Sequence, residues 1–261
     1  MRVRVRFSKF GSARYIGHLD VMRYFQKAFR RAGLPLSYSE GYHPHPILSF
    51  AQPLSLSFTS DGEYFDMELN EELSEDEIQS ALCNSMCEDI CVNKVTILPD
   101  FRLNEKKSTG MSLITGAYYA ISLKDMPVML LDSLKEFIGL QEFIIEKSTK
   151  KGTKEINLRA GIHDIFYFKE DSFETIVQTN EFAYSFDELK ASMANAMLYD
   201  NSAIVVSLDA GSENNISADL FLEGIFKYTG IDPANIKRTV HRIDLFGDKN
   251  GRNVPLWMIE S

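Results

Sequence analysis

The sequence predicts an α+β fold of two ferredoxin-like (split βαβ) lobes, with mainly antiparallel sheets and helices packed on one face. Three observations predict it. Residues 2–8 alternate strictly between charged and apolar side chains, which is typical of a strand. Residues 18–33 have apolar side chains at helical spacing. The elements after them complete the order β-α-β-β-α-β over about 100 residues, which is the order of the split βαβ sandwich.

The first strand carries arginines on one side and apolar side chains on the other. We therefore expect it to be half buried, with the arginines in solvent. The helix that follows buries one apolar face, and it ends at Gly33 and Pro35. The arginines are Arg2, Arg4 and Arg6, and the apolar face of the helix comprises Leu19, Met22, Phe25 and Phe29.

Short apolar alternations predict further extended segments between the first and second helices of this lobe. The second helix begins at Ser74, because Ser74 and Glu77 have the spacing of a capping box. A strand at residues 92–98 completes the lobe. The extended segments are expected at 36–38, 47–56 and 64–69.

Residues 99–112 are polar and punctuated by proline and glycine, which indicates a linker. We expect an N-terminal ferredoxin-like domain at 1–100, a linker at 101–112 and a second α+β domain at 113–261. The second domain has expected helices at 128–138, 186–198 and 217–229, and expected strands at 117–123, 142–148, 165–168, 174–178, 203–208 and 238–246.

The composition is that of a folded, soluble chain, with 44% hydrophobic and 25% charged residues among 261. No apolar run approaches the roughly 20 residues that cross a bilayer, so no membrane association is expected. The first ten residues alternate charge with Val and Phe and lack a signal core. Three cysteines form no disulfide framework, and we expect a cytoplasmic protein.

The net charge is −9, but it is unevenly distributed. Residues 1–31 contain nine basic residues against Asp20 alone, a net of +8, so the remaining 230 residues carry −17. A basic segment on an acidic body points to a local anionic partner, such as RNA phosphates or a phosphorylated cofactor. The alternative is that these charges pair with the acidic remainder of the chain. The sequence leaves both interpretations open.

The cysteines have the spacing C-x3-C-x3-C, close to the C-x3-C-x2-C motif of radical SAM enzymes. On a helix this spacing forms a stripe along one face, whereas a cluster site curls three thiolates around an iron–sulfur cube. The string follows a capped helix, so we expect ordinary packing cysteines and no iron–sulfur cofactor. They are Cys83, Cys87 and Cys91.

The string "YSEGYHPHP" at 38–46 holds His43 and His45, each stiffened by the proline after it. In a β conformation the two rings share a face and could bind zinc, iron or manganese together with His18 and Asp20. In polyproline geometry they diverge. The alternatives are a metal site, a hydrogen-bonded pocket without metal, and purely structural histidines; we favour the pocket.

Basic and aromatic residues also indicate an anion site. Arg14, Arg23 and the arginines of the first strand could hold phosphates, while nearby tyrosines stack on bases. The alternative is a solvated charged face. The sequence has no phosphate-binding G-x-x-x-x-G-K-[ST], dinucleotide G-x-G-x-x-G, H-E-x-x-H or G-x-S-x-G motif, so it does not name a reaction. Whether the protein is an enzyme stays open. The tyrosines are Tyr15, Tyr38 and Tyr42.

The segments "ARYIGHLDVMRYFQKAFRRAGLP" and "SEGYHPHP" lie within residues 6–69, and this stretch resembles the radical-SAM-linked family, an uncharacterised bacterial group. Residues 150–165, "KKGTKEINLRAGIHDI", are similar to a second element of that family. His43 departs from the motif, where asparagine is usual, and this leaves His45 as the better candidate. Members of the family occur beside, or fused to, a radical SAM protein with a cobalamin-binding region.

The resemblance implies an accessory protein that binds an anionic substrate, such as RNA, for a radical SAM enzyme, without a cofactor of its own. Two alternatives stay open. One is a metal-dependent hydrolase or transferase that uses His18, Asp20, His43 and His45, and the other is a docking scaffold. The expected substrate-binding residues are Arg14, Arg23, Arg30 and Arg31 for phosphates, Tyr15 and Tyr42 for stacking, and His18, Asp20, Ser39 and His45 for hydrogen bonds.

Overall fold

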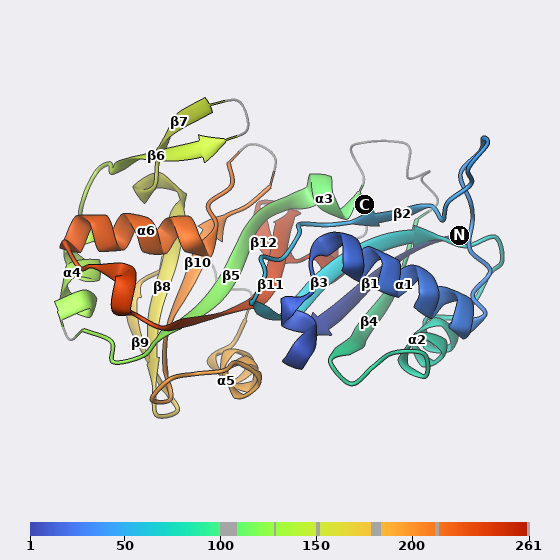
Figure 1. Ribbon diagram of the computed structural model, residues 1–261, viewed down its shortest axis with the longest axis horizontal. Coiled ribbons are helices and arrows are strands. Elements are labelled where there is room, and N and C mark those ends of the chain that lie inside the picture. Colours follow the sequence, from blue (N-terminus) through green and yellow to red (C-terminus); the bar gives the residue numbers. More distant parts are fainter. Residues whose placement is uncertain (100–108, 128, 150–151, 179–183, 212–213, 260–261) are drawn as a thin grey trace. The chain divides into compact units, whose positions relative to one another are not determined.

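The computed structural model describes residues 1–99, 109–127, 129–149, 152–178, 184–211 and 214–259 (Figure 1). It is an α+β structure whose strands pair mostly antiparallel, which confirms the predicted class. The contacts between Cα atoms divide the chain into two compact units. Unit 1 comprises Met1–Thr115 and Asp244–Ser261, and unit 2 comprises Gly116–Ile243.

The predicted domain boundaries stay a prediction. Residues 101–108, most of the expected linker, lie outside the described residues. The structure groups residues 244–261 with unit 1, whereas the sequence analysis assigns them to the second domain. The grouping of residues 244–261 with the N-terminal unit depends on contacts between distant segments, which the periodicity of a single sequence does not reveal.

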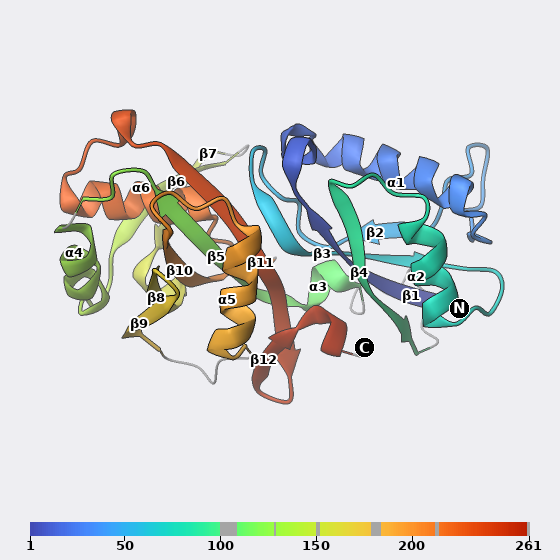
Figure 2. The ribbon, with the colours of Figure 1, turned by 90° about the horizontal axis from the view of Figure 1, so that it is seen from below.

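Unit 1 has the strand order β4-β1-β3, and β3 also pairs with β2 and β11. The pairings of β1 with β3 and β4, and of β2 with β3, are antiparallel. Both long helices of the unit lie on the same side of these strands (Figure 2). The elements are β1 (Arg2–Lys9), α1 (His18–Ala32), β2 (Leu48–Phe50), β3 (Thr59–Glu68), α2 (Glu75–Cys83), β4 (Ile90–Leu98), α3 (Gly110–Leu113), β12 (Arg252–Pro255) and the last part of β11 (Arg238–Lys249).

The two long helices of unit 1 begin where the sequence predicts, and α1 also ends where predicted. Ser74 and Glu77 form the expected capping box at the start of α2. Gly33 follows α1 with a φ of 66°, a left-handed conformation that glycine adopts without a steric penalty. Tyr38 and Leu36 make only isolated bridges, so the strand expected at 36–38 is a pair of single contacts.

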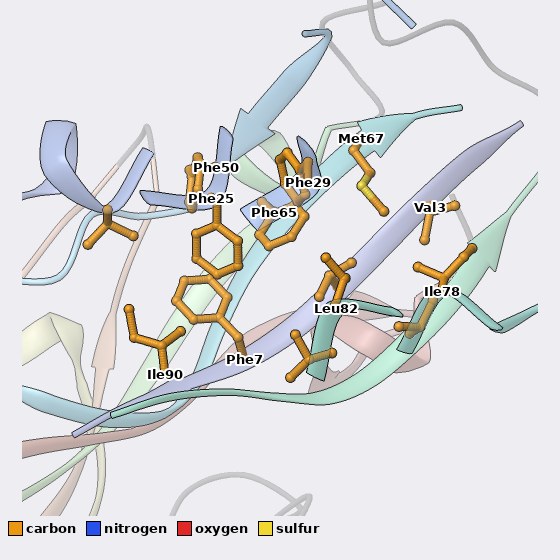
Figure 3. Packing of buried hydrophobic residues seen from close by; sticks show 14 of the residues in the cluster. Val3, Phe7, Phe25, Phe29, Phe50, Phe65, Met67, Ile78, Leu82 and Ile90 are labelled. Carbon is orange, nitrogen blue, oxygen red and sulfur yellow. The ribbon is translucent and has the colours of Figure 1, made fainter. Parts of the chain in front are cut away.

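An aromatic cluster forms the core between the helices and the strands of unit 1 (Figure 3). The ring of Phe25 on α1 packs edge-on against Phe7 of β1 and Phe65 of β3, with centroids 4.7 and 4.8 Å away. Phe29 and Phe50 extend the cluster along the same face. Aromatic pairs of this kind add about 0.5–1.5 kcal/mol each beyond the area that they bury.

The opposite face of β1 is also buried, so the prediction of a half-buried strand with solvated arginines is wrong. Arg2 and Arg4 are each only 1% exposed, and both bind the buried carboxylate of Asp66 on β3. Arg4 Nε lies 2.8 Å from Asp66 Oδ1, and the Gly110 N–H donates to Oδ2 at 2.8 Å. A carboxylate that accepts several charge-assisted hydrogen bonds can bridge two guanidinium groups in the interior.

The third arginine of β1 has a partner from the last part of the chain. Arg6 lies 2.9 Å from the carboxylate of Asp244, which also accepts the hydroxyl hydrogen of Tyr64 at 2.6 Å. Arg4 donates to the carbonyls of Leu256 and Ile259 at 2.9 and 3.0 Å. For these three arginines, the alternative interpretation, pairing with acidic residues elsewhere in the chain, is therefore the one that the structure supports.

Unit 2 has the strand order β11-β5-β10-β8-β9 and a separate antiparallel hairpin, β6-β7. Its predicted helices and strands are all present, with bounds within three residues of those expected, whereas β7 was not predicted. The elements are β5 (Ile114–Leu123), α4 (Met129–Ile138), β6 (Ile144–Thr149), β7 (Gly152–Asn157), β8 (Ile162–Lys169), β9 (Ser172–Val177), α5 (Phe186–Asn195), β10 (Ser202–Asp209), α6 (Ala218–Thr229) and the first part of β11.

Among the described residues, no helix has both the length and the apolar character that crossing a membrane requires.

We predict that Asp66→Asn destabilises the protein by about 3–5 kcal/mol, because it leaves two buried guanidinium groups without their counter-charge. Urea unfolding followed by circular dichroism measures the effect. The matched control is Asp76→Asn, an exposed residue in the first turn of α2, which should cost less than about 1 kcal/mol. Equal losses for the two variants would contradict the structural role of Asp66.

Candidate functional site

The exposed side of α1 carries a row of basic side chains. Four of the nine basic residues in the first 31 are buried or paired within unit 1, which leaves five against Asp20, a net of +4. Four of the five lie on α1 with their side chains exposed, and we call them the α1 cationic face. They are Arg23, Lys27, Arg30 and Arg31.

Two members of the α1 cationic face make contacts within the protein. Arg23 pairs with Asp20 at 3.0 Å, and both side chains are more than half exposed. Arg31 donates to the carbonyl of Ser85 at 2.7 Å and lies over the ring of Tyr24. An exposed pair such as Arg23–Asp20 contributes little to stability, about 0–1 kcal/mol, so an incoming anion can replace it at small cost.

Arg14 and Tyr15 lie just before α1 and contact each other. The Arg14 guanidinium sits 4.6 Å from the centre of the Tyr15 ring, and its Nη2 donates to the tyrosine hydroxyl oxygen at 2.5 Å. The Tyr15 side chain is 62% exposed. The pair therefore presents a cation and an aromatic surface together.

A small polar pocket lies beneath the first turn of α1, and we call it the His18 pocket. It encloses about 20 Å³, roughly the space of one water molecule, and the hollow with its open mouth measures about 340 Å³. The His18 ring packs edge-on against Phe50, with centroids 5.4 Å apart. The lining residues are Phe7, Lys9, His18, Val21, Phe50, Gln52, Pro53, Leu54, Glu63 and Tyr64.

Besides Tyr64, three titratable side chains line the His18 pocket, namely Lys9, His18 and Glu63. Burial lowers the pKa of His18, and the nearby charge of Glu63 offsets part of this effect. Lys9 donates from Nζ to the carbonyl of Ile16 at 3.1 Å. A neutral imidazole, an ammonium group and a carboxylate together offer both donors and acceptors to a ligand. The sequence analysis included His18 but missed Lys9 and Glu63.

The "SEGYHPHP" segment forms a closed loop. The Ser39 hydroxyl and His45 Nδ1 lie 2.9 Å apart, and the Ser39 hydroxyl oxygen accepts the His45 N–H at 3.1 Å. The tip residue Tyr42 is fully exposed. Beside the loop is a groove of about 700 Å³, the His45 groove. It is lined by Tyr38, Ser39, Glu40, His45, Pro46, Ile47, Leu48, Ser49, Glu68 and Thr109.

The structure does not bring the two ends of the expected site together. His18 and Asp20 lie in the first turn of α1, whereas the loop of His43 and His45 follows its last turn (Figure 1). A 15-residue helix is about 22 Å long. The His18 pocket and the His45 groove share no lining residue. The substrate residues expected from the sequence therefore fall into two separate places along α1.

The same separation argues against the four-residue metal site. Within the part of the chain that the structure describes, no group of three or more His, Cys, Asp and Glu side chains is arranged to hold a metal ion. His45 Nδ1 instead faces Ser39 and, at 3.3 Å, the carbonyl of His43. His18 and Asp20, in the first turn of α1, are therefore not placed to complete a four-residue site with His43 and His45.

The cysteines differ from the expectation of packing residues, because all three are exposed. Cys83 ends α2, Cys87 lies in the following turn and Cys91 is in β4. The capped helix thus ends before the second thiol. The stripe on one helical face, which the spacing suggested, does not exist.

Unit 2 contains a histidine–carboxylate pair that the sequence analysis did not single out. His163 Nε2 lies 2.6 Å from Asp209 Oδ1, and Asn214 donates to Asp209 Oδ2 at 2.7 Å. The hydrogen bond to Asp209 raises the pKa of His163. Gly161 is pressed against this cluster, since a Cβ there would lie 2.9 Å from Asp209 Oδ2. Distant partners of this kind have no signal in local periodicity.

Residues 2–191 match the model of the family DUF2344, whose description is "Uncharacterized protein conserved in bacteria". The chain belongs to this family. The region of this DUF2344 protein that matches includes α1, the His18 pocket, the His45 groove and His163. Asp209 and Asn214, the partners in the His163 cluster, lie outside it. The expectation of an uncharacterised bacterial family is confirmed. No curated protein matches the chain.

For this DUF2344 protein we predict that His18 titrates below the ordinary histidine value of about 6.5, and that Glu63→Gln lowers its pKa further. With a folded pKa below the unfolded one, the contribution of His18 to stability is present above the unfolded pKa and is lost as the pH falls through the folded pKa. An NMR titration of the ring measures the pKa of His18 in the wild type and in Glu63→Gln, and the His18→Gln variant assigns its signals. A pKa that rises in Glu63→Gln would contradict the arrangement.

We predict the opposite pH dependence for His163 in unit 2. Its pKa is raised, so its contribution is present below the unfolded pKa and is lost as the pH rises through the folded pKa. Asp209→Asn should therefore lower the free energy of unfolding more at pH of about 5.5 than at about 8.5. Urea unfolding at both values tests this, with the exposed Glu223→Gln as a control. A loss independent of pH would refute the ion pair.

Proposed function

We propose that this protein is an accessory substrate-binding protein that holds an anionic substrate, RNA, for a radical SAM enzyme. The observation that carries the proposal is the α1 cationic face. The arginines of β1 have partners inside unit 1, whereas the four side chains of the α1 cationic face are exposed on one helix. An overall charge of −9 limits nonspecific binding of polyanions elsewhere.

The length of the α1 cationic face favours a polyanion over a small anion. Arg23 and Arg31 are eight residues apart, which is about 12 Å along the helix axis. A single phosphate cannot contact both, but successive phosphates of one strand can. Lys and Arg contacts to phosphates supply most of the sequence-independent affinity for nucleic acids.

Exposed aromatic side chains flank the row. Tyr15 lies beside the first turn of α1, and Tyr42 lies in the loop after its last turn. Tyrosines in such positions stack on unpaired bases, which favours single-stranded RNA over a duplex. In this proposal Ser39 and His45 form hydrogen bonds with the RNA near Tyr42, and His18 forms a hydrogen bond with it near Tyr15.

The radical SAM partner rests on the resemblance of residues 6–69 to the radical-SAM-linked family. Each unit is also proposed to be a ferredoxin-like lobe. The orders β4-β1-β3-β2 in unit 1 and β11-β5-β10-β8 in unit 2 support this, because a split βαβ unit places its fourth, first, third and second strands in that sequence.

The test is the salt dependence of binding to a fluorescent single-stranded RNA. We predict that Arg23→Ala/Arg30→Ala lowers the slope of log affinity against log salt by about 1.4, since each phosphate contact to a single strand contributes about 0.7. Affinity should fall about tenfold or more. The matched control, Lys169→Ala/Lys227→Ala, removes two exposed lysines of unit 2 and should leave the slope unchanged.

Two outcomes would contradict the proposal. One is a slope that is the same in the α1 variant and the control. The other is a wild-type protein that does not bind RNA but co-purifies with the radical SAM enzyme after ribonuclease treatment, which would indicate a docking scaffold.

A further inference from the structure

The His18 pocket contains charged side chains on a face of the sheet whose other side chains are mostly apolar. The strands β1 and β3 present Val5, Phe7 and Phe65 to the helices. Glu63 lies directly opposite Phe7 on this same face, and it is 5% exposed. Lys9, at the end of β1, lines the same pocket and is 2% exposed.

Burial of these two groups is costly to the extent that partners within the protein do not offset it. Moving a carboxylate or an ammonium group out of water costs several kcal/mol per ion before its partners are counted, and well-packed apolar residues of similar size often do as well. Ionisable groups that cluster in a hollow next to a group with a shifted pKa are typical of ligand sites. His18, at the mouth, is such a group.

The chemistry and size of the pocket limit what it can bind. Glu63 accepts hydrogen bonds, Lys9 donates them, and a neutral His18 does one of each. The enclosed space of about 20 Å³ takes about one non-hydrogen atom, and the aromatic residues Phe50 and Tyr64 contribute to its lining. The ligand therefore presents a polar edge that carries a donor next to an acceptor, on a body that is planar or narrow.

We propose that the His18 pocket reads the edge of one unpaired RNA base that has an exocyclic amino group beside a ring nitrogen acceptor, as cytosine and adenine have. Glu63 accepts from the amino group, as acidic side chains do from cytosine N4, and Lys9 or His18 donates to the ring nitrogen. This inference rests on the proposed RNA-binding function and adds a base preference to it. Lys9 and Glu63 are its specificity-determining residues.

The test compares the binding of oligocytidylate, oligoadenylate and oligouridylate at one salt concentration. The wild type should bind the first two about tenfold more tightly than oligouridylate. Glu63→Gln and Lys9→Met should each reduce this ratio to near one, and the slope of log affinity against log salt should change little in Glu63→Gln. The matched control is Glu72→Gln, an exposed residue of unit 1 that lines neither the His18 pocket nor the His45 groove, which should keep the preference.

A measurement on the wild type guards against variants that fail to fold. Added CMP should shift the His18 ring signals in NMR spectra at concentrations where UMP does not, because only CMP has the amino group.

RNA binding with equal affinity for the three homopolymers, together with His18 signals that CMP and UMP shift equally, would overturn the base preference and leave the proposed function intact. A wild type that binds none of the three would overturn both.

Discussion

The carboxylate of Asp66 is the constraint on which unit 1 depends. It binds two arginines of β1 and the backbone of Gly110, in a place without access to water. Because both arginines bind this carboxylate, both faces of β1 can be buried, with the aromatic cluster on one side and the ionic network on the other. Loss of the carboxylate would leave two charges in a low dielectric, so the network fixes the pairing of β1 with β3.

The ionic network also determines which charges remain for function. It holds the arginines of β1 inside the protein and leaves Arg14 and the α1 cationic face, besides the buried Lys9, as the remaining basic residues of the first 31. The His18 pocket lies under the first turn of the α1 helix, whereas the His45 groove is lined by the loop after its last turn and by Leu48 and Ser49 of β2.

The sequence predicted the helices and most strands well, because amphipathic periodicity, the Ser74–Glu77 capping box and Gly33 act locally. It could not predict that Asp66 and Asp244 hold the arginines of β1, because these partners are 62 and 238 residues away. The same limit applies to the candidate site. His18 was found from its motif, but Glu63 reaches the pocket only through the register of β3, and the distance from His18 to His45 follows from the path of the chain around α1.

The discontinuity of unit 1 has a consequence for biosynthesis. Arg4 and Arg6 receive their partners at Leu256, Ile259 and Asp244 only after the ribosome has made all of unit 2. Until then, the nascent segment carries guanidinium groups that cannot yet be buried at low cost. Unit 1 therefore completes this network only after the chain has returned to it from unit 2.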